Sequence, residues 1–166
     1  MMGVALMTMA VANAQVAQAD IEASQKRVAE LQKLVDSQPK QCGVAEVDGF
    51  AANASSAAVL AIANSQKLSE LYGKKATGAE WVDLGTSVAA EAKQLKDAQD
   101  KAATAAKKLQ DLGDEAKKGN PMAKAKAAKQ VKSASSVMTY AKDALSILAV
   151  ETVEQGKMVS QMAKGQ

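Results

Sequence analysis

Small and apolar residues recur at alternating spacings of three and four along nearly the whole chain. This spacing is typical of helices that pack together along a seam. Four such runs predict four helices, at about residues 15–37, 50–72, 78–118 and 121–163. We therefore expect an all-α fold, an antiparallel four-helix bundle-like arrangement. The two long helices form a coiled-coil hairpin, and the two shorter helices pack at its open end.

The segment Gly119-Asn120-Pro121 interrupts the helical pattern between the two longest runs. Glycine suits a helix end, Asn120 can cap the following helix, and Pro121 fits its first position. When the chain is folded back here, the apolar positions of both runs face each other in one register. The facing pairs include Leu112 with Ala127, Ala102 with Met138, and Trp81 with Val159. The break is therefore predicted to make one hairpin and not to separate two domains.

Local signals mark the starts of the second and third helices. Asp48 is the expected N-cap of the second helix. Thr77-Gly-Ala-Glu80 has the spacing of a capping box, with Thr77 at the N-cap and Glu80 at N3. One seam position of the third helix is a carboxylate, Glu91. A buried, functional glutamate is one interpretation, but we expect an edge glutamate that reaches water.

Alanine dominates the composition, with 36 of 166 residues, whereas four residues are aromatic: Phe50, Tyr72, Trp81 and Tyr140. Alanine has the highest helix propensity but buries little apolar area. The helices should therefore form readily and pack closely around a thin core. We expect long helices, self-association or a protein partner to supply the missing burial.

The basic residues are almost all lysine: 20 Lys and one Arg against 18 acids, for a formal net charge of +3. Nucleic-acid recognition relies on Arg and on aromatic stacking, so a nucleic-acid partner is not expected. The chain has no histidine, the commonest general base and a frequent ligand of zinc and haem. It also lacks a P-loop, a dinucleotide-binding glycine motif and a CxxC pair. We expect no catalysis, no cofactor and no metal.

Positive charge concentrates around the predicted turn of the hairpin. Residues 96–133 carry ten Lys and five acids, and we expect them to protrude as an arm because the shorter helices cannot cover the whole hairpin. Six lysines follow one another there without an intervening acid: Lys117, Lys118, Lys124, Lys126, Lys129 and Lys132. They predict a docking site for an anionic partner, such as an acidic protein segment, a polyanionic glycan or lipid headgroups. The plainer interpretation is a solvated helix tip.

The first nineteen residues contain no charged side chain. The apolar run from Val4 to Val11 is too short for a transmembrane span, which takes about 20 residues, but it suits the hydrophobic region of a secretory signal. Ala12 and Ala14 are the small residues that a cleavage before Gln15 requires. We expect residues 1–14 to be a signal peptide, truncated at its start or preceded by an upstream start, and residues 15–166 to form one helical domain. The expected localisation is then periplasmic or secreted; an ordinary helix turn is the alternative.

Cys42 is the only cysteine, and it lies in the least helical stretch, SQPKQCGVAEVDG, residues 37–49. An intramolecular disulfide is therefore excluded. In an oxidising compartment Cys42 is a candidate for an inter-chain disulfide, whereas a lone thiol tucked under a loop is the plainer interpretation.

These features favour a non-catalytic, exported binding or assembly module. One alternative is a membrane-active protein similar to α-helical pore formers, although the uncharged segment 50–66 is too polar to be a good spanning helix. Another is a periplasmic holdase, because a small Lys-rich helical protein with projecting arms resembles the jellyfish-like holdase chaperones in general plan. Those chaperones also need β-strands for their trimeric body, and we expect no strands here except in GVAEV, residues 43–47.

Overall fold

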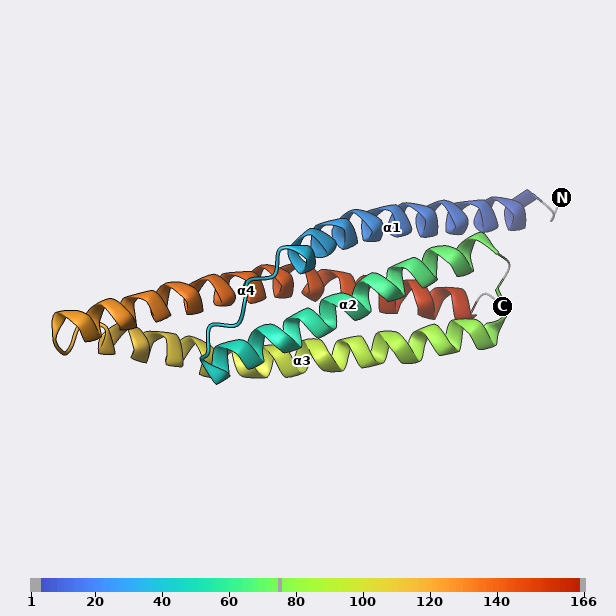
Figure 1. Cartoon of the computed structure of the whole chain (residues 1–166). Coiled ribbons are helices and arrows are strands. Elements are labelled where there is room, and N and C mark those ends of the chain that lie inside the picture. The colour runs from blue at the N-terminus through green and yellow to red at the C-terminus, as the bar shows by residue number, and fades with distance from the viewer. Residues whose placement is uncertain (1–3, 75, 165–166) are drawn as a thin grey trace.

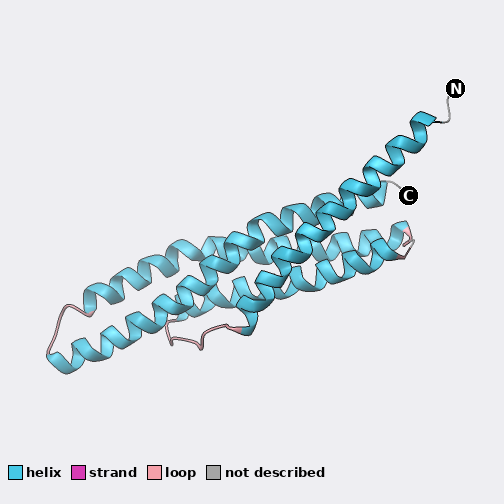
Figure 2. Ribbon diagram, turned by 90° about the horizontal axis from the view of Figure 1, so that it is seen from above, coloured by secondary structure: helices cyan, strands magenta, loops and turns pink. Residues whose placement is uncertain are grey.

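The computed structural model describes residues 4–74 and 76–164, and their side chains from Gln18 onward. Within these residues the chain forms four helices and no strand (Figure 2). The helices are α1 (Val4–Asp36), α2 (Ala45–Gly73), α3 (Gly78–Glu115) and α4 (Pro121–Lys164). The all-α, bundle-like fold expected from the sequence is confirmed.

The long helices α3 and α4 run antiparallel and form a hairpin that projects beyond the other two helices (Figure 1). α2 lies along both of them, while α1 packs against α2 and α4 and does not contact α3 in the described residues. The start of α2 and residues 100–104 of α3 line one groove. The end of α1 and residues 143–147 of α4 line another. The hairpin beyond these points is the projecting part.

The core is divided into two clusters along the length of the bundle. The larger cluster contains Leu31, Phe50 and Leu148, none of which has any exposed surface, together with many seam alanines. The smaller cluster lies toward the open end of the hairpin and is built around Trp81 and Val159. Trp81 and Val159 are one of the pairs expected to face each other. Because alanine side chains are small, the buried seam alanines add little apolar volume to this core.

The turn between α3 and α4 has the predicted cap chemistry. Asn120 Oδ1 accepts a hydrogen bond from the backbone N of Ala123 at 2.9 Å, and α4 begins at Pro121. Gly119 has φ +93°, a value that favours glycine. The predicted end of α3 at residue 118 was wrong by three residues, because the helix ends at Glu115 and the following lysines form the turn.

The start of α3 is also as predicted, since both bonds of the capping box between Thr77 and Glu80 are present. The start of α2 differs. α2 begins at Ala45, five residues before the predicted start, and its N-cap residue Val44 makes no side-chain capping bond. Asp48 was therefore wrongly predicted as the N-cap: its carboxylate lies inside the first turn and instead accepts from the backbone N of Cys42 and of Gly43, both at 2.9 Å.

GVAEV was wrongly interpreted as the stretch with strand character. Ala45 to Val47 belong to the first turn of α2, and Gly43 has φ +77° in the preceding loop. Val44 and Val47 are both buried, and a spacing of three suits one face of a helix.

α1 begins at Val4, eleven residues before the predicted start of the first helix at 15. It therefore runs through most of the segment predicted to be a signal peptide. Residues 1–3 lie outside the described residues, as do the side chains up to Ala17. Helical backbone is compatible with both interpretations of this segment. Across the helices that the structure describes, none is both long enough and apolar enough to span a membrane.

Candidate functional site

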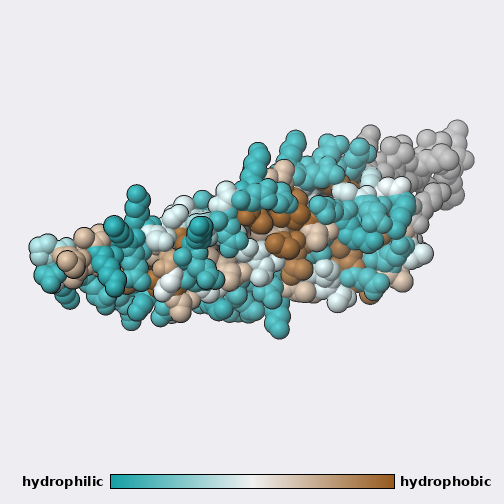
Figure 3. Space-filling view, viewed as in Figure 1, coloured by the Kyte–Doolittle hydropathy of each residue, from teal (hydrophilic) through white to brown (hydrophobic). Residues whose placement is uncertain are grey.

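The six lysines of the predicted docking surface all lie at the projecting end of the hairpin, and all are exposed. We call them the lysine tip. Two of them, Lys117 and Lys118, lie in the turn after α3, and the other four lie on the first part of α4. Figure 3 shows hydrophilic side chains over most of this end, whereas the larger hydrophobic areas on this face lie further along the molecule.

Among the described residues, most of the lysine tip has no intramolecular counter-ion. Lys117 Nζ lies 2.8 Å from Asp114 Oδ1, and this hydrogen bond, with the positive charges of Lys117 and Lys118, lowers the pKa of Asp114. In the part of the chain that the structure describes, the other five lysines form no salt bridge. Five ammonium groups of the lysine tip are therefore free to meet an anion.

The spacing of the tip lysines places like charges side by side. Lys126, Lys129 and Lys132 follow one another at intervals of three on α4, so they are neighbours on one helix face. Each like-charge neighbour destabilises a helix by roughly 0.2–0.5 kcal/mol. Lysines near a helix N-terminus also oppose the helix dipole. The lysine tip therefore concentrates positive charge at a cost to the stability of α4.

An apolar side chain accompanies these charges. Met122, in the first turn of α4, is 83% exposed, the largest value among the exposed large hydrophobic residues of the described chain. It lies four residues before Lys126 and so on the same face. Ala125 and Ala128, both exposed, lie beside this row and add little bulk to the surface.

Cys42, the candidate for an inter-chain disulfide, lies in the loop before α2 and is partly buried. Its Sγ donates a hydrogen bond to Asp48 Oδ1 at 3.1 Å. Burial raises the pKa of the Cys42 thiol, and the hydrogen bond to Asp48 raises it further. A raised pKa leaves less of the thiol in the thiolate form, which is the reactive one.

A buried polar layer separates the two apolar clusters, and all four helices contribute to it. Its first half surrounds Glu151 on α4, which has no exposed surface. Arg27 Nε donates to Glu151 Oε2 at 2.7 Å, and Ser24 on α1 donates to the other oxygen. Gln155 Nε2 also donates to Glu151, at 2.7 Å, and to the carbonyl of Ala61 at 2.9 Å.

The second half of the layer surrounds Glu91 on α3, which also has no exposed surface. Thr152 Oγ1 donates to Glu91 Oε1 at 2.6 Å, and Asn64 Nδ2 donates to Glu91 Oε2 at 2.7 Å. No cation pairs with it in the described residues. Burial raises the pKa of Glu91 despite these two hydrogen bonds, and the charge of Glu151 adds to the rise. The expectation of an edge glutamate that reaches water was wrong, because α2 and α4 both cover this seam position.

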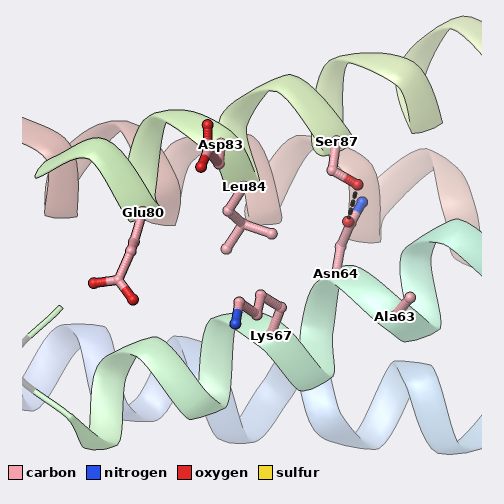
Figure 4. A pocket seen from close by; sticks show the side chains of 7 residues that line it. All are labelled: Ala63, Asn64, Lys67, Glu80, Asp83, Leu84 and Ser87. Atoms are coloured by element: carbon pink, nitrogen blue, oxygen red, sulfur yellow. Dashed lines mark hydrogen bonds between the residues drawn. The ribbon is translucent and has the colours of Figure 1, made fainter. Parts of the chain in front are cut away.

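A groove lies between α2 and α3 beside this half of the layer (Figure 4). Its volume is about 380 Å³, and its rim carries Lys67, Glu80 and Asp83. Two of its lining residues are joined across the helices, because Ser87 Oγ donates to Asn64 Oδ1 at 2.6 Å; Asn64 in turn donates to Glu91. The hydroxyl of Ser87 thus donates its proton to an amide oxygen, which is not a base that could activate it.

No known protein family, curated protein or solved structure matches this chain. The function is therefore argued from the geometry. Within the described residues, no group of three or more His, Cys, Asp or Glu side chains could hold a metal ion.

The polar layer was not predicted as a unit, although the sequence contains a signal for it. Polar residues occupy seam positions in all four helical runs: Ser24, Asn64, Glu91, Thr152 and Gln155. The seam pattern does not reveal their partners Arg27 and Glu151, which lie off the seam. A charged side chain beside a seam is usually solvated, so its burial depends on how the four helices are placed.

Proposed function

We propose that this protein is a non-catalytic, exported binding or assembly module that docks an anionic partner on its lysine tip. The observation that supports this proposal most strongly is a group of five exposed lysines at the projecting end of the hairpin, none of which pairs with an acid in the described part of the chain. The chain contains seven lysines and no acid between Glu115 and Asp143. A helix face that serves only to solvate the protein gains from mixed charges, which pair at spacings of three and four.

The arrangement of the bundle supports the same proposal. The polar layer and the smaller apolar cluster lie in the part of the molecule where α1 and α2 cover the hairpin (Figure 1). The larger cluster begins there and continues between α3 and α4 into the projecting part, through Ala105, Leu112 and Ala134. Outside that seam, the projecting end exposes charge on both sides of the turn. Such an arm can reach an anionic surface while the bundle remains folded.

A panel of defined polyanions tests the proposal: poly-glutamate, heparin and anionic lipid vesicles. The test variant carries Lys→Gln at all six tip positions, and the matched control carries Lys→Gln at six exposed lysines outside the arm: Lys26, Lys33, Lys40, Lys93, Lys142 and Lys164. We expect at least one polyanion to bind wild type and the control, and to bind the tip variant at least tenfold more weakly. Absence of binding to the whole panel, or equal losses in both variants, would refute the proposal.

Export rests on the sequence of residues 1–14 and has its own test. Mass spectrometry of the protein isolated from its native host should find Gln15 as the mature N-terminus. A mature chain that retains Met1 would exclude cleavage, without bearing on the lysine tip.

A further inference from the structure

We propose that the anionic partner is a lipid bilayer surface, on which the outer face of the first turns of α4 lies flat. This inference rests on the proposed function and names the partner of the same lysine tip. The row Met122, Lys126, Lys129 and Lys132 contacts the bilayer: the three ammonium groups meet lipid phosphates, and Met122 enters the boundary between headgroups and acyl chains.

The shape of the row fits a broad surface. Its four residues follow one another at spacings of four, three and three, so they lie along one face of α4 over about 15 Å. This face lies on the projecting part of the hairpin, where α1 and α2 do not cover it (Figure 1). Ala125 and Ala128 are exposed beside the row and are short, so a flat surface can approach the helix closely.

The chemistry of the row fits lipid better than an acidic protein segment. Lysine presents a compact charge on a long apolar stem, and such side chains can contact apolar surface while the ammonium stays in the headgroup region. Protein interfaces usually depend on aromatic or Arg anchors, and the chain offers no such residue between Gly113 and Thr139. Met122 is 83% exposed beside these charges, and one apolar side chain next to a basic cluster is suited to a membrane interface.

The test uses vesicles of phosphatidylcholine alone and vesicles that also contain phosphatidylglycerol, with poly-glutamate as the soluble comparison. The row variant is Lys126→Gln, Lys129→Gln and Lys132→Gln, and its matched control is Lys26→Gln, Lys40→Gln and Lys93→Gln. Each lysine near an anionic surface contributes roughly fivefold to binding. We therefore expect the row variant to bind phosphatidylglycerol vesicles about a hundredfold more weakly than wild type, and the control to bind them about as tightly as wild type. Neutral vesicles should bind none of the three proteins.

A second measurement reports on Met122 itself. An environment-sensitive fluorophore on Met122→Cys, in a Cys42→Ser background, should shift to the blue with phosphatidylglycerol vesicles and not with poly-glutamate. Binding to vesicles without this shift would overturn the insertion of Met122. Binding to poly-glutamate but not to vesicles, weakened by the row variant, would overturn the lipid inference and leave the proposed function standing. No lysine-dependent binding to any polyanion would overturn both.

Discussion

Arg27 Nε donates to Glu151 Oε2 at 2.7 Å, and this ion pair connects α1 to a carboxylate with no exposed surface at the centre of the bundle. The Arg27 side chain retains 24% of its exposure, so the pair lies between the interior and water. Ser24 on the same helix reaches the other oxygen of Glu151. Because α1 does not contact α3, its position depends on α2, α4 and these polar contacts. The pair is therefore one of the contacts that hold α1 on the bundle, beside the apolar packing of Leu31.

Arg27→Met should lower the free energy of unfolding by roughly 2–3 kcal/mol, because it leaves a buried carboxylate without its cation. Urea unfolding measures the change. Lys26→Met, on the same helix but exposed, should change stability by less than about 0.5 kcal/mol. The double variant Arg27→Met and Glu151→Gln should be more stable than Arg27→Met alone, since the unpaired charge is gone. Strictly additive effects of the two substitutions would show that the pair is not coupled.

Glu91 should make stability depend on pH in an unusual direction for a carboxylate. Burial raises its pKa in the folded chain above the ordinary value of about 4.5. The ionised form therefore destabilises the fold fully above the folded pKa, and this penalty disappears as pH falls through the folded pKa toward the ordinary value.

Comparison with Glu91→Gln isolates this effect from the other carboxylates. The variant cannot ionise, so its stability relative to wild type should be greatest near neutral pH and should shrink as the solution is acidified. Urea unfolding of both proteins between pH 4 and 8 measures the difference. If the difference stays constant or widens on acidification, the raised pKa of Glu91 is wrong.

Gly119→Ala should destabilise the hairpin turn by roughly 1–2 kcal/mol, because the φ of +93° is unfavourable for a residue with a Cβ. The new Cβ would also lie 3.3 Å from the Cβ of Ala123. Gly113→Ala is the matched control: a Cβ there meets nothing within 4 Å, and alanine in helix α3 should gain up to about 1 kcal/mol. Hydrogen exchange at the turn amides, together with thermal unfolding, checks both. Equal effects at the two glycines would contradict the observed turn geometry.

Neutralising the centre of the lysine row should stabilise the protein. Lys129→Gln removes the repulsion of Lys129 with its two neighbours, Lys126 and Lys132. It should raise the free energy of unfolding by roughly 0.5 kcal/mol at low salt. The gain should fade at high salt because exposed charges are screened. Lys96→Gln, which breaks the salt bridge of Lys96 with Asp100, should give no gain. If Lys129→Gln brings no gain at low salt, the lysine row carries no repulsion, and the argument that its charge serves binding loses its support.

Much of the fold could be predicted from the sequence because the signals are local. Seam spacing gives the helices, and the residues at the turn, Gly119, Asn120 and Pro121, give the hairpin. The capping box of Thr77 and Glu80 has the same origin. The start of α2 was missed because Asp48 binds the backbone of the preceding loop, a contact that depends on the loop conformation and not on the residue pattern.

The candidate site could be predicted where it depends on exposure and charge alone. The lysine tip follows from a run without acids at a helix turn. The polar layer could not be predicted fully, because it needs residues far apart in sequence: Asn64 reaches Glu91 and Arg27 reaches Glu151 only when α1 and α2 are in place. Glu91 was wrongly expected to reach water for the same reason, since its burial depends on where α2 lies.

The most direct test of the central claim is the salt dependence of binding to phosphatidylglycerol vesicles, measured for wild type and for the variant with Lys→Gln at all six tip positions. Raising the salt from about 50 to about 300 mM shortens the screening length from more than 10 Å to about 6 Å. If the lysine tip docks an anionic surface, wild-type affinity should fall more than tenfold over this range, and the variant should bind weakly throughout. Wild-type binding that is unchanged by salt, or a variant that binds as tightly as wild type, would contradict the account.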